Sequence, residues 1–301
     1  MSAYLLLGLA AVLLASYAVY DKVVVFEHVT DEFFLAFTSR IMIFLLVAPF
    51  LLLPSVSIPG QRLALISVAA GFLYILSSLV YFTGVKKGDP STMIVFLNAK
   101  PALVVLAAAA FLGEVLHAVQ YAGIAVIVGA TLLLSVAKME GKLRLRETAK
   151  YGAVFAVVVA GIDLVSKYVI TSLDPLAFYA LAGIGQGIGG TLGLGYLWLR
   201  RRDTVTSNAT YPGLRAIAVR SILFVAGLTL FYIALATTPV SIASSIVATQ
   251  TALTVLFIWL LVRLRKVHPT NLGDVPFSVK LLASLGIMTG VTLISRPEIL
   301  L

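Results

Sequence analysis

The 301-residue sequence contains no cysteine, which excludes a disulfide framework and a metal site built from thiolates. Histidine is also scarce, and His28, His117 and His268 lie far apart near the ends of apolar stretches, so they form no ligand cluster. No metal and no cofactor are therefore expected. Charged residues make up only 12% of the chain, about half of the share that soluble proteins usually carry. That shortage argues against a soluble globular fold.

Apolar residues are correspondingly abundant in the sequence. They make up 60% of the chain, and the mean hydropathy is +1.06. A helix needs about 20 apolar residues to cross a hydrocarbon core of roughly 30 Å. Stretches of about that length are predicted as membrane-crossing helices at 3–20, 33–53, 63–85, 91–112, 119–137, 151–172, 176–199, 216–237, 240–262 and 278–295. The sequence predicts an all-α, multi-pass protein of the cell membrane, with the lipid bilayer as its surroundings.

Basic residues give a net charge of +9, but they sit at the ends of apolar stretches and form no module that reads nucleic acid. No basic residue precedes the first stretch, so we expect it to remain as a helix. Connectors after odd-numbered stretches hold 17 Lys and Arg residues, among which we count Arg220, and connectors after even-numbered stretches hold 2. Positive loops stay cytoplasmic. The bias predicts that both termini are extracytoplasmic.

The chain divides into two similar halves. A charged connector at 138–150 separates residues 1–137 from residues 151–301, and each half holds five predicted helices. An odd number of crossings forces the second half to be inverted relative to the first, which is a common plan of membrane transporters. Shifting the chain by 150 residues places Lys100 on Gln250. These observations predict two inverted repeats.

The EamA repeats of the drug/metabolite transporter superfamily resemble three runs of this chain: YFTGVKKGDPSTMIVFLNAKPALVVLAAAAFLGEVLHAVQYAGIAVIVGATLLL, GIDLVSKYVITSLDP and ALATTPVSIASSIVATQTALTVLFIWLL. The second half departs from the pattern, because Leu264 stands at the position of Glu114 and Thr251 at that of Pro101. The resemblance implies a 5+5 inverted-repeat bundle of ten helices. It also implies a central cavity lined mainly by helices 1, 3, 4, 6, 8 and 9, and movement of small metabolites by alternating access.

Lys100 is the first candidate for a substrate-binding residue, because it lies near the centre of the stretch 91–112. A lysine there costs about 2.5 to 3.5 kcal/mol to insert, so it should face other helices or a cavity. It has no carboxylate on its own helix, so it loses its proton, is solvated by cavity water or binds an anion. We favour the third, in which Lys100 binds a carboxylate or phosphate of the substrate. Asn98, Gln250 and the carbonyls freed by Pro101 are secondary candidates, although Asn98 is two residues away and points to another face.

Asp163 and Lys167 are four residues apart, in the order that favours an ion pair on one helix face. They form either a neutral structural pair or a coupling pair, in which Asp163 exchanges a proton or a substrate amine against Lys167. Arg40 either snorkels to the nearer surface, the interpretation we favour, or reaches the cavity.

Other residues of the apolar stretches allow packing and functional roles alike. Tyrosines are mostly packing or interface anchors, and the candidates that could line a site are Tyr17, Tyr81 and Tyr232. Glycines between 183 and 195 favour tight packing within a monomer, with a hinge or a homodimer contact as the alternative. The protein is expected to be a monomer or a homodimer.

An enzyme is not expected, because the sequence has no HExxH motif, no paired intramembrane aspartates and no nucleophile beside a base. A transporter of a small polar metabolite with a carboxylate or phosphate fits the polar residues at mid-membrane. The alternative within transport is an amino-acid, amine or drug exporter. A receptor or scaffold, or a membrane-embedded enzyme, fits less well.

Overall fold

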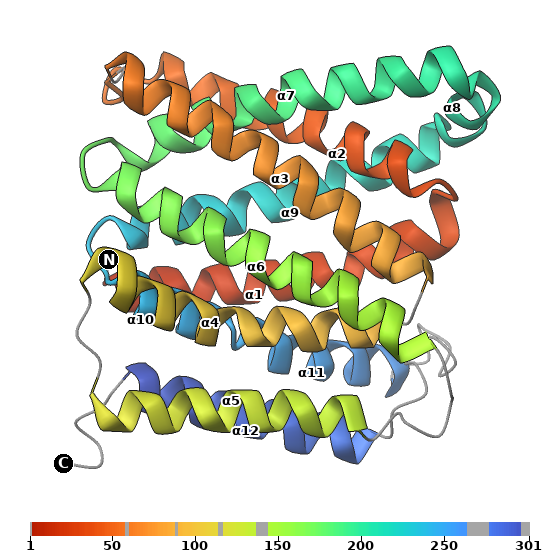
Figure 1. Cartoon of the computed structure of the whole chain (residues 1–301). Helices are drawn as coiled ribbons and strands as arrows, with labels where there is room; N and C mark the ends of the chain where they lie inside the picture. Colours follow the sequence, from red (N-terminus) through yellow and green to blue (C-terminus); the bar gives the residue numbers. More distant parts are fainter. Residues whose placement is uncertain are drawn as a thin grey trace.

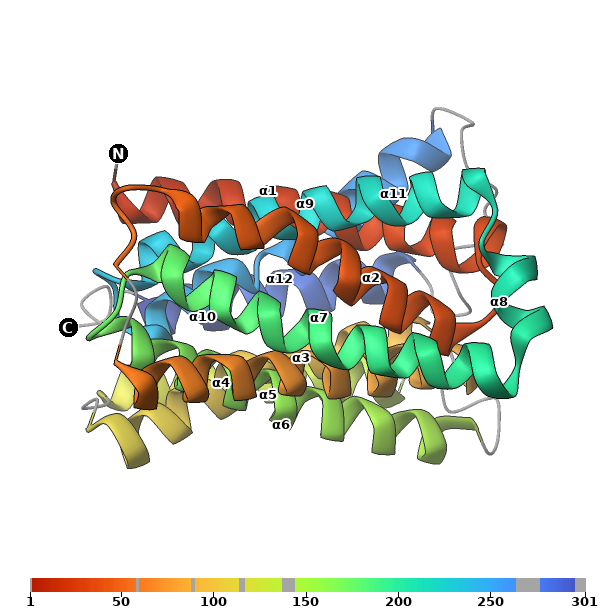
Figure 2. The ribbon, with the colours of Figure 1, turned by 90° about the horizontal axis from the view of Figure 1, so that it is seen from above.

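The structure, a computed structural model, describes residues 2–57, 60–87, 90–113, 117–136, 144–263 and 277–295, and all regular elements in these ranges are helices. The long helices lie side by side with roughly aligned axes (Figure 1). A view turned by 90° shows the same alignment and the short helix that crosses one end of the bundle (Figure 2). The chain is therefore an all-α bundle, as the sequence predicts.

Residues 2–136 form five long helices with two distorted turns at helix ends. A π-helical turn, η1, follows the first helix and a 3-10 turn, η2, follows the second. The elements are α1 (Ala3–Val23), η1 (Val24–His28), α2 (Glu32–Val47), η2 (Ala48–Leu52), α3 (Gln61–Lys87), α4 (Pro90–Leu112) and α5 (Ala118–Val136). The Asp31 carboxylate caps α2 by accepting the Phe34 N–H at 2.7 Å.

Residues 144–263 and 277–295 form seven helices, the shortest with 7 residues and the longest with 27. They are α6 (Arg144–Ile170), α7 (Pro175–Arg200), α8 (Arg202–Asn208), α9 (Tyr211–Leu235), α10 (Val240–Val247), α11 (Gln250–Arg263) and α12 (Phe277–Ser295). Asp174 caps α7 by accepting the N–H groups of Leu176 and Ala177, and Pro175 stands at its first position, where no N–H is needed.

Within the described residues, five helical segments are long and apolar enough to cross a membrane: Ala3–Asp21, Glu32–Leu52, Gln61–Gly84, Lys150–Ile170 and Tyr211–Leu235. Shorter apolar helical segments lie in α4, α5 and α12. Many large apolar side chains on these helices are exposed to the surroundings of the bundle, among them Leu5, Leu65 and Val157. This arrangement suits a multi-pass membrane fold, because lipid replaces water around the apolar surface.

The predicted helix 240–262 is divided into α10 and α11, which differs from the expectation. Ala248 and Thr249 separate the two helices, and the Ala248 N–H donates to Ser244 and Ser245 carbonyls at 3.1 and 3.2 Å. The Thr249 hydroxyl donates to the Ile246 carbonyl at 2.7 Å. A threonine side chain that bonds the local backbone in this way competes with the helical ladder.

Glycines of α7 pack against two neighbouring helices of the same chain. Gly185 faces the Val68 carbonyl and Gly71 of α3, and Gly187 faces the Phe44 ring of α2. A Cβ at Gly185 would overlap the Val68 carbonyl oxygen, so only glycine allows the two backbones to approach this closely. The predicted packing role within the monomer is confirmed.

Candidate functional site

A cavity of about 140 Å³ lies inside the bundle, between α1, α2, α3, α4, α6, α9, α10 and the start of α11. Its volume suits a small molecule and is below the ~300–1,000 Å³ typical of drug-sized pockets. The helices expected from the family resemblance all contribute, because the eighth predicted stretch corresponds to α9 and the ninth to α10 and α11. In addition, α2 contributes Arg40. Most of the wall is apolar or aromatic, and the charged side chains in it are Arg40, Lys100, Asp163 and Arg220.

Lys100 of α4 is paired with Asp163 of α6. The Lys100 Nζ lies 2.7 Å from Asp163 Oδ2, and the Ser244 hydroxyl of α10 donates to the same oxygen at 3.1 Å. Lys100 Nζ also lies 5.9 Å from the centre of the Phe231 ring. The sequence predicted a lysine without a carboxylate partner on its own helix. The structure shows that a partner comes from another helix, because α6 packs beside α4 and provides Asp163.

Lys167, one turn beyond Asp163 on α6, points to the end of α9. Its Nζ donates to the carbonyls of Leu235 and Thr238, each at 2.9 Å. The last carbonyls of a helix have no partner within the helix, so a lysine there stabilises them. Asp163 and Lys167 therefore connect α6 to two other helices. Asp163 forms an ion pair with Lys100 of α4, and Lys167 donates to carbonyls at the end of α9.

Arg40 of α2 faces inward, with only 5% of its surface exposed. Its Nε donates to the Ser78 hydroxyl of α3 and its Nη1 to the Gln186 side-chain oxygen of α7, both at 2.8 Å. The Cζ atom lies 5.4 Å from the Tyr74 ring centre and 5.5 Å from that of Phe224. The favoured snorkelling interpretation of Arg40 is wrong, because packing of α2 against α7 and α3 turns this face toward the cavity.

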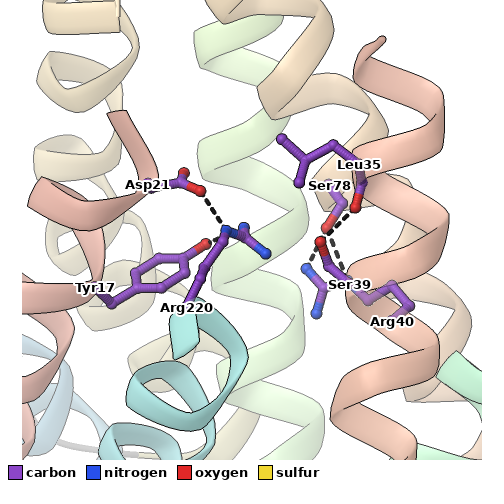
Figure 3. Close-up of polar contacts among 7 residues, drawn as sticks. All are labelled: Tyr17, Asp21, Leu35, Ser39, Arg40, Ser78 and Arg220. Atoms are coloured by element: carbon purple, nitrogen blue, oxygen red, sulfur yellow. Dashed lines mark hydrogen bonds and ion pairs between the residues drawn. The ribbon is translucent and has the colours of Figure 1, made fainter. Parts of the chain in front are cut away.

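Arg220 of α9 forms an ion pair with Asp21 of α1, and its Nη2 donates to the Tyr17 hydroxyl at 2.6 Å (Figure 3). Its Cζ lies 4.9 Å from the Tyr17 ring centre and 5.1 Å from that of Phe82. Counting Arg220 among the loop charges was wrong, because it lies inside α9 with 2% exposure. The signal was present, since position 220 falls within the predicted stretch 216–237.

The remaining predicted site residues take different places. Tyr17 and Tyr81 line the cavity, and so does Gln250 at the start of α11. Tyr232 lies behind the wall, fully buried, with its hydroxyl against that of Tyr74, which lines the cavity. Asn98 belongs to α4, and its side chain lies outside the described part of the structure.

Sequence reasoning missed the polar partners of Arg40, namely Ser78 and Gln186, and the pair of Asp21 with Arg220. Within the described ranges, no three His, Asp or Glu side chains come together in a way that would hold a metal ion. The cavity thus offers buried cations, one carboxylate, amide and hydroxyl groups, and aromatic faces. These groups can hold a small polar molecule through charge and hydrogen bonds.

Comparison with known proteins gives a family and a fold. Residues 1–136 match the model of the EamA-like transporter family. A search of the curated proteins finds no match. A solved structure, described only as a crystal structure of a protein, is similar over 96% of this chain and 98% of that chain, with a TM-score of 0.69 and 16% identity. At that identity, the likeness shows the fold alone.

Proposed function

We propose that the protein is a multi-pass membrane transporter of small molecules and not an enzyme, and that it is a secondary transporter working by alternating access, because residues 1–136 match the model of the EamA-like transporter family. In this proposal the chain crosses the cell membrane ten times, with α10 and α11 forming one crossing and α8 lying at one end. Both termini are extracytoplasmic, following the excess of Lys and Arg in the connectors after odd-numbered helices.

Two inverted repeats, residues 1–137 and 151–301, joined by the connector 138–150, carry the proposed movement. The family match ends at residue 136, one residue before the proposed end of the first repeat. Helix packing supports the second repeat, because α1 packs on α9 as α6 packs on α3, while α2 packs on α7 and α5 on α12. A two-fold relation between the repeats requires these pairings. Alternating access then rocks one repeat against the other around the cavity.

The substrate in this proposal is a small polar metabolite whose carboxylate or phosphate binds Lys100. The observation that carries it is the Lys100 ammonium in the cavity wall, 2.7 Å from Asp163. A buried cation needs an anionic partner, so a substrate anion can replace the Asp163 carboxylate only if that carboxylate is neutralised or moves away. Gln250, Tyr17 and Tyr81 supply further contacts from the wall, with Asn98 and Tyr232 as secondary positions.

Proton coupling through Asp163 follows from this competition. Asp163 is the only acidic residue that lines the cavity in the described part of the chain. When Asp163 takes a proton, Lys100 loses its counter-ion and the substrate anion takes that place. When the substrate leaves, the Asp163 proton leaves as well and the ion pair reforms. Lys167 keeps this part of α6 attached to the end of α9, another helix of the second repeat. A change at Asp163 therefore alters the contact of that repeat with Lys100 of the first.

An amino-acid, amine or drug exporter is the second candidate. Two observations favour it: the Asp163 carboxylate can accept an amine in exchange for Lys100, and aromatic rings of Phe155, Phe224 and Phe231 line the cavity. Cations bind well over such rings.

Flux into proteoliposomes separates these functions. We expect saturable uptake of a small organic anion by the purified protein and loss of most of that uptake in Lys100→Ala. Uptake of amines alone would support the second candidate. Binding without uptake would indicate a receptor. A thermal-shift screen against metabolites selects the compounds to test.

A further inference from the structure

The charges around the cavity do not balance within the described part of the chain. Lys100 is neutralised by Asp163, and Arg220 by Asp21. Arg40 also lines the cavity, yet the side chains that it bonds, Ser78 and Gln186, are both neutral. One positive charge is thus left over, and it is located at Arg40.

The Arg40 guanidinium also has hydrogen-bond capacity to spare. It carries five N–H donors. Nε and Nη2 donate to the Ser78 hydroxyl, and Nη1 donates to the Gln186 oxygen, so three donors are used. The rings of Tyr74 and Phe224 also lie next to the guanidinium, with their centres 5.4 and 5.5 Å from Cζ. A guanidinium that is fixed by neutral partners, keeps unused N–H donors and is more than nine-tenths buried is a preorganised site for an oxyanion.

The Arg220 guanidinium is a second positive charge near Arg40, and it also favours an anion in this part of the cavity. Arg220 of the neighbouring helix α9 also lines the cavity, and its guanidinium extends toward that of Arg40 of α2 (Figure 3). Asp21 lies on the far side of Arg220, toward α1, and does not reach Arg40 (Figure 3). Like charges that face each other across a low-dielectric space are stabilised by an anion between them.

We propose that the carried molecule has two anionic groups, one bound by Lys100 and the other by the Arg40 guanidinium. This inference rests on the proposed function, which places only the first group. A single anion on Lys100 would leave Arg40 without a counter-ion. A dianion, together with one proton on Asp163, leaves the filled cavity neutral. The cavity of about 140 Å³ suits a small molecule such as a short dicarboxylate.

The test compares each dianion with a partner of similar size that lacks one charge. Malonate, succinate and glutarate are measured against their half-amides by the concentration that gives a half-maximal rise in melting temperature. We expect at least one dianion to act at a concentration at least tenfold lower than its partner. Arg40→Gln and Lys100→Gln should each remove that advantage, and Arg202→Gln, an exposed arginine of α8, should keep it.

Arg40→Lys replaces Arg40→Gln in this comparison if Arg40→Gln does not fold. It keeps the charge and loses the planar fork, so the dianion should still act at a lower concentration than its partner, with a smaller advantage than in the wild type. The inference fails if no dianion in the wild type acts at a lower concentration than its partner. In that case the proposed function still stands, provided that uptake of a monoanion depends on Lys100. If no anion stabilises the protein and putrescine does, the proposed function fails as well.

Discussion

Asp21 and Arg220 form an ion pair that ties the end of α1 to α9, and the two residues are only 1% and 2% exposed. Tyr17, one turn before Asp21 on α1, accepts a further hydrogen bond from Arg220 at 2.6 Å. The pair joins the two proposed repeats beside the cavity. Two buried charges of opposite sign tolerate their loss of solvation only while both are present.

Removing the cation of this pair should therefore destabilise the protein strongly. Arg220→Met leaves the Asp21 carboxylate buried without its partner, at an expected cost of about 3 to 5 kcal/mol. Thermal unfolding in detergent measures the loss. Arg215→Met on the same helix is the control, because Arg215 is exposed. The double variant Asp21→Asn with Arg220→Met should lose less than the sum of the two single variants, and equal melting temperatures for Arg220→Met and Arg215→Met would contradict the pairing.

The helices of this fold could be predicted well because apolar length is a local property. The stretch predicted at 33–53 corresponds to α2 and η2, which end at Leu52, and the stretch at 63–85 to α3. Lipid leaves each crossing segment little choice other than a helix. The break between α10 and α11 escaped prediction because residues 240–263 contain no glycine and no proline to signal a helix end.

The composition of the cavity wall could be predicted in part. Lys100, Gln250, Tyr17 and Tyr81 were expected at a site because polar groups inside a membrane stretch face the interior, and all four line the cavity. Their partners could not be predicted. Arg40 and Gln186 are 146 residues apart, and Asp21 and Arg220 are 199 apart. Which helices meet, and with which face, is decided by packing across the whole bundle.

The glycine seam of α7 gives a prediction with a control on the same helix. Gly185→Ala places a methyl group against the Val68 carbonyl, and we expect a loss of about 1 to 3 kcal/mol from overpacking. Gly195→Ala meets no atom within 4 Å, so it should leave stability unchanged or raise it by up to about 1 kcal/mol through helix propensity. Melting temperatures of both variants and the wild type, measured in the same detergent, test this prediction. Equal changes in melting temperature for the two variants would contradict the close approach of α7 and α3.

Proton coupling is tested by Asp163→Asn. The amide keeps the shape of the carboxyl group but carries no exchangeable charge, so counterflow of bound substrate should continue while the response to an imposed pH gradient disappears. Proteoliposome uptake with and without the gradient measures this. Asp203→Asn on α8 is the control, because Asp203 is exposed and should keep the wild-type response. Wild-type uptake that ignores the pH gradient would remove the basis for the coupling role.

The orientation of the termini is tested by a reporter fused after Leu301. Because Arg220 is buried in α9, the Lys and Arg bias between the two sets of connectors becomes 16 against 2, which still favours extracytoplasmic termini. We expect the reporter to behave as an extracytoplasmic protein in cells. A cytoplasmic signal at that position would overturn the orientation and leave the fold unaffected.

Lys100→Ala is the most direct test of the substrate site. The change removes the ammonium that is proposed to hold a substrate anion, and a hydrogen bond to a charged group is worth about 1.5 to 3 kcal/mol. The affinity for an anionic substrate should therefore fall by roughly ten- to a hundredfold, since about 1.36 kcal/mol is a factor of ten. The protein should still fold, because Asp163 keeps the hydrogen bond from the Ser244 hydroxyl.

The control for Lys100→Ala is Lys150→Ala, a change at an exposed lysine on α6 that should leave the affinity as it is in the wild type. Competition against labelled substrate in proteoliposomes gives both affinities. An anion affinity that is unchanged in Lys100→Ala would remove Lys100 from the site. Flux of a cationic amine that also survives the change would assign the lysine a structural role as the counter-ion of Asp163, and would favour the amine exporter.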